Sequence, residues 1–424
     1  PEGSEWLAYD NLLIEAETAK KFCLQAPFNK RPPQENEPPK ITIPDNLPLN
    51  FRSSTSTQAS FGNILNELSR GNTDLASRIV TTSPDVTVST NLGPWVNQRG
   101  VFSLDVRNDV FRDEKVASAQ KWLRHGTGQH FELGIAENNL FIMLAALGLS
   151  GPLFGTRLLP IGTLYDPFIA RGLDSLNYAC YQDARFMLVA TPAGITLAPE
   201  GGAHQSISSP LIGIGQPGLS SYEPAYADEL AVIMRWAFEY MQAEKGGSIY
   251  LRLSTRAIDQ PSREMKPELE NQIIKGAYWH IPPTDGARIA IVYSGAVVPE
   301  VIEAYEQLKE EIPELGIMAI TSYDRLYHDW QRSQVENIEG RNNIDCHIIN
   351  LLAPLHSNAV LITVQDAHPA TLSWLGSATG RKLLPLGVTE FGQSGNIRDL
   401  YRQYGIGADA IIDAAARASI KHSH

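Results

Sequence analysis

The sequence predicts an α/β protein made of two doubly wound domains, each with a parallel sheet covered by helices on both faces. Short, continuously apolar segments alternate with longer segments of helical periodicity along most of its 424 residues. Strands that are buried on both faces of a parallel sheet have this continuous apolar character, whereas half-exposed strands alternate. A polar, proline-containing stretch at 257–274 separates two such series. We therefore expect one domain over 56–274, a second over 275–424, and a linker between their sheets.

Residues 1–55 are expected to form an N-terminal helix and arm instead of a third domain. Residues 1–23 have the character of a polar helix, and residues 24–50 hold seven prolines with little periodicity. Proline-rich segments of this kind act as extended spacers. We expect the arm to lie along a larger body or to link to one upstream. The sequence does not begin with Met, and we interpret it as the middle of a longer chain.

The first domain is expected to begin with a helix and then to alternate strands with helices. This helix starts at Thr57 and stops at Gly71, a residue type found at helix ends. Apolar runs bounded by turn residues predict the strands, and longer periodic segments predict the helices. Strands are expected within 77–90, 152–162, 185–194, 211–216 and 247–255, and helices within 132–151, 167–183 and 225–244.

The second domain repeats this alternation with fewer elements. Apolar runs predict strands within 287–295, 315–323 and 359–367. Helices are expected over 299–311 and from Gly407 to the end of the sequence.

Composition excludes several classes of protein. No run of about 18 apolar residues is present, so a membrane span is not expected. The net charge of −12 argues against nucleic-acid binding, because phosphates would be repelled. The first residues lack the pattern of a signal peptide. Three cysteines, at 23, 180 and 346, form no metal spacing and fit packing roles in a reducing cytoplasm.

A loop with titratable side chains follows the apolar run at 185–194. It places Glu200, Gly201, Gly202 and His204 within five residues. Ligands bind at the carboxyl ends of strands in open α/β sheets, and a histidine there can act as an acid or base near neutral pH. The loop is therefore either a ligand-facing segment or an ordinary surface turn with a solvated Glu and His.

Glu137 opens a helix whose positions up to Leu149 are nearly all apolar or small. This pattern predicts a helix buried on all sides, running from an acid into a core. A buried ionised carboxylate needs a partner. The acid either interacts with the helix dipole or holds a ligand nitrogen. His125, His130 and His368 are each open to a ligand contact or to an ordinary role in a loop.

Several motifs together resemble one enzyme family. The segments "GIAENN", "EGGAHQS" and "FGQSGNIRDLYRQYGI" resemble motifs of the thiamine diphosphate-dependent transketolase superfamily. The segments "PEGSE", "RGLDSLNYACYQDAR", "SYEPAYADELAVIM" and "IKGAYW" follow in the order found in the homodimeric pyruvate dehydrogenase decarboxylase component. The resemblance covers essentially the whole chain. It identifies 56–274 as a pyrimidine-binding domain and 275–424 as a transketolase-like C-terminal domain.

The resemblance implies roles for three catalytic residues. Glu137 would hydrogen-bond the pyrimidine ring nitrogen of thiamine diphosphate and favour the imino tautomer, which can deprotonate the thiazolium carbon. His204 would face the substrate oxygen as a donor or proton shuttle, with Glu200 beside it. The cofactor would perform the bond cleavage, and the protein would supply orientation and electrostatics.

Four further residues receive binding roles from the resemblance. Asp85 matches an acid near the cofactor. Tyr165 and Phe168 fall where aromatic side chains line the pyrimidine pocket, although both could be ordinary core aromatics. Arg256 could bind the acidic end of the substrate or could be a surface charge at a strand end.

Two departures from the family leave alternatives open. The continuation "QSISSP" after His204 is closer to transketolase, so transfer of a two-carbon unit from a ketose phosphate competes with decarboxylation of a 2-oxo acid such as pyruvate. No G-D-G motif for the diphosphate and Mg²⁺ is present, and "PTDGAR" does not replace it. We therefore predict no metal ligands in this chain and place them on a missing half or a partner chain. The assembly would be a homodimer or hetero-oligomer. A non-catalytic scaffold that has lost its metal site is the remaining alternative.

Overall fold

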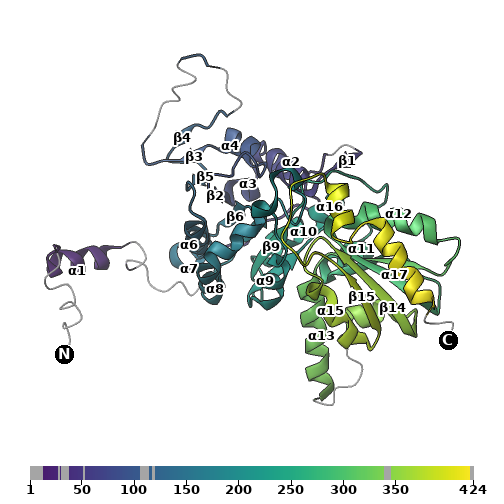
Figure 1. Ribbon diagram of the computed structural model, residues 1–424. Coiled ribbons are helices and arrows are strands. Elements are labelled where there is room, and N and C mark those ends of the chain that lie inside the picture. The colour runs from purple at the N-terminus through teal and green to yellow at the C-terminus, as the bar shows by residue number, and fades with distance from the viewer. Residues whose placement is uncertain are drawn as a thin grey trace.

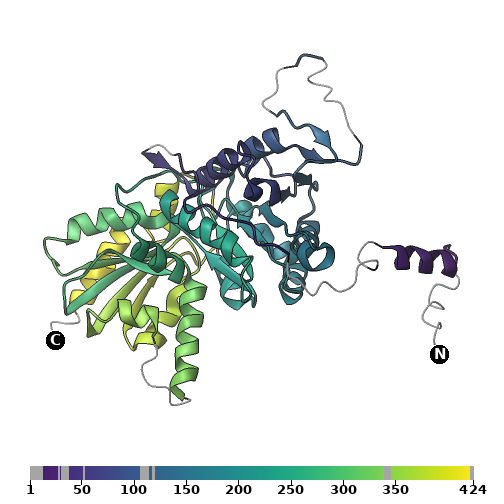
Figure 2. The same cartoon turned by 180° about the vertical axis from the view of Figure 1, so that it is seen from behind.

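The computed structural model describes residues 13–26, 29, 38–50, 53–105, 114–116, 120–338 and 345–420. The α/β class is confirmed: the described residues form two large sheets, one in each of two domains that lie side by side, and a small two-stranded sheet (Figures 1 and 2). Within the described residues, no helix has the length and apolar character needed to span a membrane.

The central domain contains an eight-stranded sheet in the order β4-β3-β5-β2-β6-β7-β9-β8. Every neighbouring pair in this sheet is parallel, as expected. Its strands are β2 Ile79–Ser83, β3 Val101–Phe102, β4 Arg124–His125, β5 His130–Glu132, β6 Leu159–Leu164, β7 Met187–Ala190, β8 Leu219–Tyr222 and β9 Ser248–Arg252. Its helices are α2 Thr57–Ser69, α3 Asp74–Arg78, α4 Gly93–Arg99, α6 Glu137–Gly148, α7 Ser150–Phe154, α8 Leu173–Tyr181, α9 Ser209–Gly215 and α10 Ala227–Tyr240, with the 3₁₀ segment η3 Asp166–Gly172 before α8.

Alternate residues of β7 show that both faces of this sheet are buried. Met187 and Val189 pack into the core that also contains helices α2, α4 and α10. Leu188 and Ala190 pack into a second core with α6 and α8. A strand with two buried faces has no polar side to display, which explains its unbroken apolar sequence.

The C-terminal domain contains a five-stranded sheet in the order β11-β13-β12-β14-β15. Its strands are β11 Ala277–Ile281, β12 Ala287–Ser294, β13 Gly316–Ile320, β14 Leu355–Gln365 and β15 Lys382–Leu386. Its helices are α12 Val298–Leu308, α13 Tyr323–Ile338, α14 His347–Leu351, α15 Ala370–Thr379, α16 Ile397–Gln403 and α17 Ala408–Ile420. The expectation of a fully parallel sheet is wrong for β11, which pairs antiparallel with β13. β11 is an edge strand, and an antiparallel edge strand on an otherwise parallel sheet is a common arrangement in mixed sheets.

The two domains share a hydrophobic core. Ile161 and Val189 of the central sheet and Ile291 and Ile362 of the C-terminal sheet are all fully buried in one cluster. The stretch at 257–274, expected to be a linker, contains β10 Ile258–Asp259 and part of α11 Pro267–Lys275. β10 pairs with β1 Ser54–Thr55 at the start of the central domain.

The prediction of a strand over residues 211–216 is wrong, because residues 211–215 belong to helix α9. A short apolar run cannot be assigned to helix or strand from its periodicity. Pro210 lies in the first turn of α9, a position that favours a helix. The edge strand β8 follows at Leu219.

The N-terminal segment lies partly outside the described residues. α1 spans Ala16–Gln25 and stands apart from both domains (Figures 1 and 2). The predicted helix over 1–23 is therefore described only from residue 13 onward. The arm at 38–50 has no regular structure but lies along the central domain, where Ile41 and Leu47 are buried. Backbone groups of Ile41 hydrogen-bond the buried Gln242 side chain.

Candidate active site

The candidate site lies at the carboxyl ends of β5, β6 and β7. Because these strands are parallel, their ends meet at one edge of the sheet. Five residues after β5 the chain reaches Glu137. After β6 it reaches Tyr165 and Phe168, and after β7 it continues to the loop with Glu200 and His204.

Glu137 is the first residue of α6, and only 8% of its surface is exposed. Its Oε1 accepts a hydrogen bond of 2.7 Å from Nη1 of Arg171. The guanidinium of Arg171 also lies over the ring of Phe168, 3.9 Å from its centroid. The buried acid therefore has a protein cation as its partner, and this cation covers an aromatic ring of the site.

Arg171 was not predicted from the sequence as a site residue. It follows Phe168 by three residues in "FIAR", so both side chains lie on the same face of a helical turn. This spacing was the available signal. The spacing of Phe168 and Arg171 indicates a site residue only when Glu137 is known to lie next to Arg171.

The predicted helix buried on all sides is not found in this chain. Leu140, Phe141 and Leu144 of α6 are buried, but Ile142 is 54% exposed and the preceding Ile135 is 80% exposed. Apolar composition shows that a face requires cover, but it does not show which chain provides the cover.

Tyr165, Phe168 and His204 form one aromatic group. The rings of Tyr165 and Phe168 stack with centroids 6.1 Å apart and an interplanar angle of 19°. The His204 ring packs edge-on against both, at 5.8 Å and 5.7 Å. Its Nδ1 lies 4.0 Å from Oε2 of Glu200, is buried, and has no hydrogen-bond partner among the described residues. The structure thus brings four of the predicted residues together, and leaves one imidazole nitrogen without a hydrogen bond.

Two glycines let this loop pack against the C-terminal domain. A Cβ on Gly201, which has φ +81°, would lie 2.3 Å from Oγ of Ser394, and a Cβ on Gly202 would lie 2.4 Å from the Gly392 carbonyl oxygen. Gln205 Nε2 also donates to the carbonyl of Gln393 at 3.0 Å. The motif segments "EGGAHQS" and "FGQSG" are therefore in direct contact, although they lie far apart in sequence.

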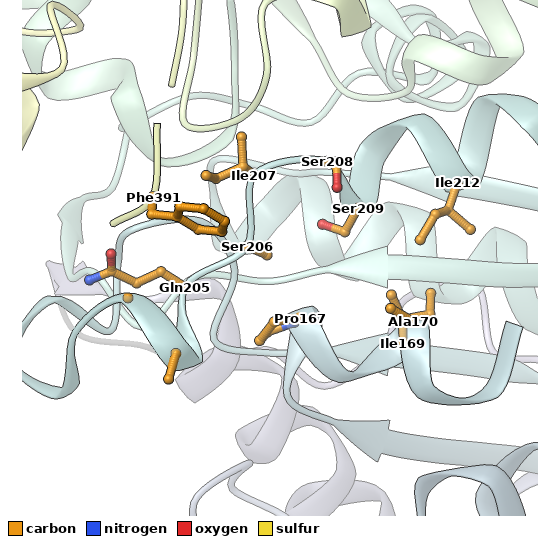
Figure 3. Close-up of a pocket in the computed structure, with 12 residues that line it drawn as sticks. Pro167, Ile169, Ala170, Gln205, Ser206, Ile207, Ser208, Ser209, Ile212 and Phe391 are labelled. Carbon is orange, nitrogen blue, oxygen red and sulfur yellow. The ribbon is translucent and has the colours of Figure 1, made fainter. Parts of the chain in front are cut away.

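The loop forms one wall of a cavity of 560 Å³. Figure 3 shows Ile207 and Phe391 on one side of it and Pro167 on the other. The lining residues are Pro167, Ile169, Ala170, Gly202, Ala203, Gln205, Ser206, Ile207, Ser208, Ser209, Ile212 and Phe391. Phe391 reaches the cavity from the C-terminal domain and is 88% exposed. The walls are mostly apolar, and serine hydroxyls supply the polar groups.

Asp85 is exposed, and it adopts a left-handed backbone conformation with φ +68°. Its backbone N–H donates to Oε1 of Glu132 at 2.9 Å. Glu132 also accepts from Thr87 and lies beside the buried His130. Burial alone would raise the pKa of Glu132, but hydrogen bonds from His130, Thr87 and the Asp85 backbone hold it below its ordinary value. The structure thus anchors the backbone of Asp85 at the end of β5.

The other predicted side chains have protein partners. Both terminal nitrogens of Arg256 bond the carboxylate of Glu300 at 2.7 Å, and one also donates to the Ala296 carbonyl. Arg256 therefore joins the two domains, and its contact with the substrate stays a prediction. His125 and His368 bond groups two residues away in their own loops.

A buried ionic network that the sequence reading missed lies under the loop. Arg252, at the end of β9, bonds Asp166 at 2.9 Å and Glu223 at 2.6 Å, and all three side chains are almost fully buried. Nη2 of Arg252 also donates to the backbone carbonyl of Asp366 at 3.0 Å. Burial raises the pKa of Glu223 to about 7 and that of Asp366 to about 6, although Arg252 opposes both shifts.

This network should make stability depend on pH. Because the folded-state pKa values of Glu223 and Asp366 are raised, their stabilising contribution is present at low pH and is lost as the pH rises through about 6 and 7. We expect the free energy of unfolding in urea to fall between about pH 5 and pH 8, by on the order of 2 kcal/mol for Glu223. Glu223→Gln mimics the protonated acid and should flatten this slope. An equal slope in the variant would contradict the assignment.

Comparisons with known proteins support the resemblance to the transketolase-like superfamily of thiamine diphosphate-dependent enzymes. Residues 51–259 match the family described as "Pyruvate dehydrogenase E1 component middle domain". The chain is 26% identical over 381 residues to the "Pyruvate dehydrogenase E1 component" of Escherichia coli (strain K12), a match that covers 85% of this chain and 41% of that protein. The chain thus spans less than half the length of this relative.

Solved structures share the fold. The transketolase from Leishmania mexicana aligns with a TM-score of 0.65 and 17% identity, covering 95% of this chain and 50% of that chain. A second structure, "Split gene transketolase, inactive beta4 tetramer", aligns with a TM-score of 0.58 and 18% identity. There the alignment covers 86% of this chain and 98% of the other.

Proposed function

We propose that this chain is the pyrimidine-side half of a thiamine diphosphate enzyme that decarboxylates a 2-oxo acid such as pyruvate. The observation that carries the proposal is the buried carboxylate of Glu137 at the start of α6, in one site with the ring of Phe168. A buried acid adds nothing to apolar packing and costs free energy when it is charged. Its position is explained if it serves a ligand.

The residues of the site fit the pyrimidine end of the cofactor. A carboxylate suits the ring nitrogen, the face of Phe168 suits a flat heterocycle, and Nδ1 of His204 still lacks a hydrogen bond among the described residues. When bound, thiamine diphosphate supplies the nucleophilic thiazolium carbon that attacks the carbonyl group of the substrate. Arg171 holds an oxygen of Glu137 and a face of Phe168, so we propose that it yields these contacts to the pyrimidine.

Each residue has a specific task in this proposal. Glu137 holds a proton at the ring nitrogen, and Tyr165 and Phe168 orient the ring. His204 donates to the oxygen of the substrate, and Glu200, at 4.0 Å, orients its imidazole. Asp85 would lie near the cofactor, where the hydrogen bond from its backbone to Glu132 fixes its position.

The diphosphate and its Mg²⁺ belong to another domain or subunit in this proposal. Within the part of the chain that the structure describes, no group of three or more His, Cys, Asp or Glu side chains could hold a metal ion. The likeness to the chain titled "Split gene transketolase, inactive beta4 tetramer", which this chain covers almost entirely, supports the proposal that the other half is a separate chain. The name of that transketolase describes an inactive tetramer, and we propose that this chain is likewise inactive without its other half.

An uncovered apolar face marks where further protein would bind. Large exposed side chains occur before α6, within α6 and on α8, and these two helices pack against each other. They are Ile135, Ile142, Leu173, Tyr178 and Tyr181. An exposed patch of this kind is typical of an interaction surface. We propose that a second copy or the diphosphate-binding subunit covers it.

The isolated chain is expected to bind neither thiamine diphosphate nor Mg²⁺ tightly. The hard oxygen ligands that Mg²⁺ needs would be supplied by the other half. Isothermal calorimetry of the chain, alone and with that half added, measures this directly. Micromolar binding to the chain alone would show that it contains a diphosphate site.

His204→Ala is expected to slow turnover by roughly 10²-fold without slowing cofactor activation. The reason is that His204 serves the substrate, whereas Glu137 serves the cofactor. Deuterium exchange at the thiazolium carbon of the reconstituted enzyme measures activation, and turnover measures the whole reaction. Slowed deuterium exchange would show that His204 acts in cofactor activation. Unchanged turnover would show that the loop is an ordinary surface turn.

A panel of substrates separates the two candidate reactions. The continuation "QSISSP" after His204 favours transketolase-like transfer. In the structure, Ser206 and Ser209 of this continuation are engaged with Asp166, so they support the loop from within. Turnover of pyruvate or 2-oxobutyrate supports the decarboxylase, and turnover of a ketose phosphate supports the transferase.

A further inference from the structure

Asp166 occupies a central position between the two halves of the site. Its side chain is fully buried, and it lies between Tyr165 and Phe168 in sequence. Its carboxylate accepts hydrogen bonds from four side chains: Ser206, Ser209, Tyr250 and Arg252. These donors come from the loop, from α9 and from β9, so one carboxylate connects three separate parts of the chain.

The contact with Ser206 fixes the loop two residues after His204. The Ser206 hydroxyl donates to Asp166 and accepts from the backbone N–H of Gly194 at 2.9 Å. The backbone N–H of Ser206 in turn donates to the Gly194 carbonyl at 3.3 Å. Ser209 holds the next turn of the chain to the same carboxylate at 2.6 Å. The loop is thereby fastened to the segment that carries Tyr165 and Phe168.

The turn at Gly194 connects the same network to the C-terminal domain. A Cβ on Gly194, which has φ +60°, would lie 2.4 Å from the Asp366 carboxyl carbon. The next residue, Ile195, donates its N–H to this carboxylate, and the hydroxyl of Tyr401 donates to it at 2.9 Å. The chain therefore makes room for a second buried carboxylate under the loop.

Stability alone does not account for this arrangement. Asp166, Glu223 and Asp366 are buried around one guanidinium, Arg252. Desolvating such groups costs more than apolar side chains of the same volume would, so a buried ionic network is weak evidence for a gain in stability. What the network does provide is directional hydrogen bonds, and here these end on the loop that carries His204.

We propose that Asp166 is a positioning residue that sets the His204 loop against the aromatic segment 165–168, with Arg252 as its counter-ion. The assignment of the loop to the substrate rests on the proposed function. The hydrogen-bonded attachment of the loop to Asp166 can be measured independently of the proposed function. Asp166 acts through Ser206 and Ser209 and does not itself contact the substrate.

The first test measures hydrogen exchange in the chain alone. Asp166→Asn keeps the size of the side chain but replaces an acceptor oxygen with an NH₂ group that faces hydrogen-bond donors. We expect amides of residues 198–206 to exchange at least about tenfold faster, because loops with fewer hydrogen bonds open more readily, while the strand amides at 187–190 keep their rates. The matched control is Asp174→Asn, which changes an exposed acid in α8 and should leave the exchange rates of the wild type unchanged.

The double variant Ser206→Ala/Ser209→Ala covers the case in which Asp166→Asn does not fold. It leaves Asp166 and Arg252 in place and removes the two hydroxyls that bond Asp166, Arg252 and the Gly194 N–H, so the same local acceleration is expected. Unchanged exchange in the loop would overturn the proposal. Acceleration of equal size across both domains would also overturn it, because it would show a general loss of stability.

The second test uses the chain reconstituted with its diphosphate-binding half. Ser206→Ala should raise KM for the 2-oxo acid about tenfold and leave deuterium exchange at the thiazolium carbon unchanged. A fall in exchange with an unchanged KM would overturn the role in substrate positioning. If the wild type turns over neither a 2-oxo acid nor a ketose phosphate, the proposed function fails, and so does the link to the substrate. The exchange measurement on the chain alone still decides whether Asp166 fastens the loop.

Discussion

Glu137→Gln is expected to lower turnover of the reconstituted enzyme by on the order of 10²–10⁴-fold while leaving the fold intact. Gln has the size of Glu and can still accept the hydrogen bond from Arg171, which now ends on Oε1 at 2.7 Å. It cannot hold a proton between itself and a ring nitrogen. The loss should therefore appear in cofactor activation, and deuterium exchange at the thiazolium carbon should slow in parallel with turnover.

The matched control is Glu239→Gln, an exposed acid on α10. It should leave turnover, exchange and the urea unfolding curve unchanged. Near-normal turnover in Glu137→Gln would remove the cofactor role of this residue and leave it as a helix-start acid paired with Arg171. Absence of turnover in the wild type, together with unchanged cofactor exchange in the variant, would favour the non-catalytic scaffold.

The fold class could be predicted because strands buried on both faces of a sheet have continuously apolar sequences. β7 is apolar throughout, β12 is apolar from Ile289 to Tyr293, and alternate residues of each strand enter different cores. Strand direction has no such sequence pattern, so the antiparallel edge strand β11 was not predicted. The prediction of a strand in place of α9 was wrong for a related reason, because a short apolar run is compatible with a buried helix or a buried strand.

The candidate site could be predicted only in part. Glu137 and the loop with His204 were visible because each places a titratable group in an apolar or glycine-rich setting. Arg171 was missed because its partner Glu137 lies 34 residues away in sequence. Ion pairs between residues far apart in sequence follow from the topology of the sheet, and no local sequence pattern predicts them.

The sequence around Arg252 does indicate a buried charge, although Arg252 was not predicted as a site residue. It interrupts the apolar strand "SIYLRLST", and a charge in the middle of a buried strand is almost always paired. The sequence reading favoured Arg256, four residues later, at the end of the run. In the structure Arg256 keeps 17% of its side chain exposed, whereas Arg252 is fully buried. A position inside an apolar strand, as for Arg252, therefore predicted burial of the charge better than a position at the end of the strand, as for Arg256.

Arg252→Met is expected to destabilise the protein by about 3–5 kcal/mol, the range for a buried ion pair that loses one partner. Met has a similar length and is apolar, so the change removes charge and hydrogen bonds with little loss of volume. Asp166 and Glu223 then lose their guanidinium partner. Because Arg252 now opposes the effect of burial on Glu223, the pKa of Glu223 would rise further, so the destabilisation should be larger at pH 8 than at about pH 5.5.

Urea unfolding of the chain at these two pH values measures both effects. Arg288→Met is the matched control, because Arg288 lies in strand β12 but is exposed, and it should change stability by less than about 0.5 kcal/mol. Adding Glu223→Gln to Arg252→Met should restore part of the stability at pH 8, since one uncompensated carboxylate is removed. A loss below about 1 kcal/mol, or one that is equal at both pH values, would show that water or another group already compensates these acids. Arg252 would then not be the charge that holds the network in place.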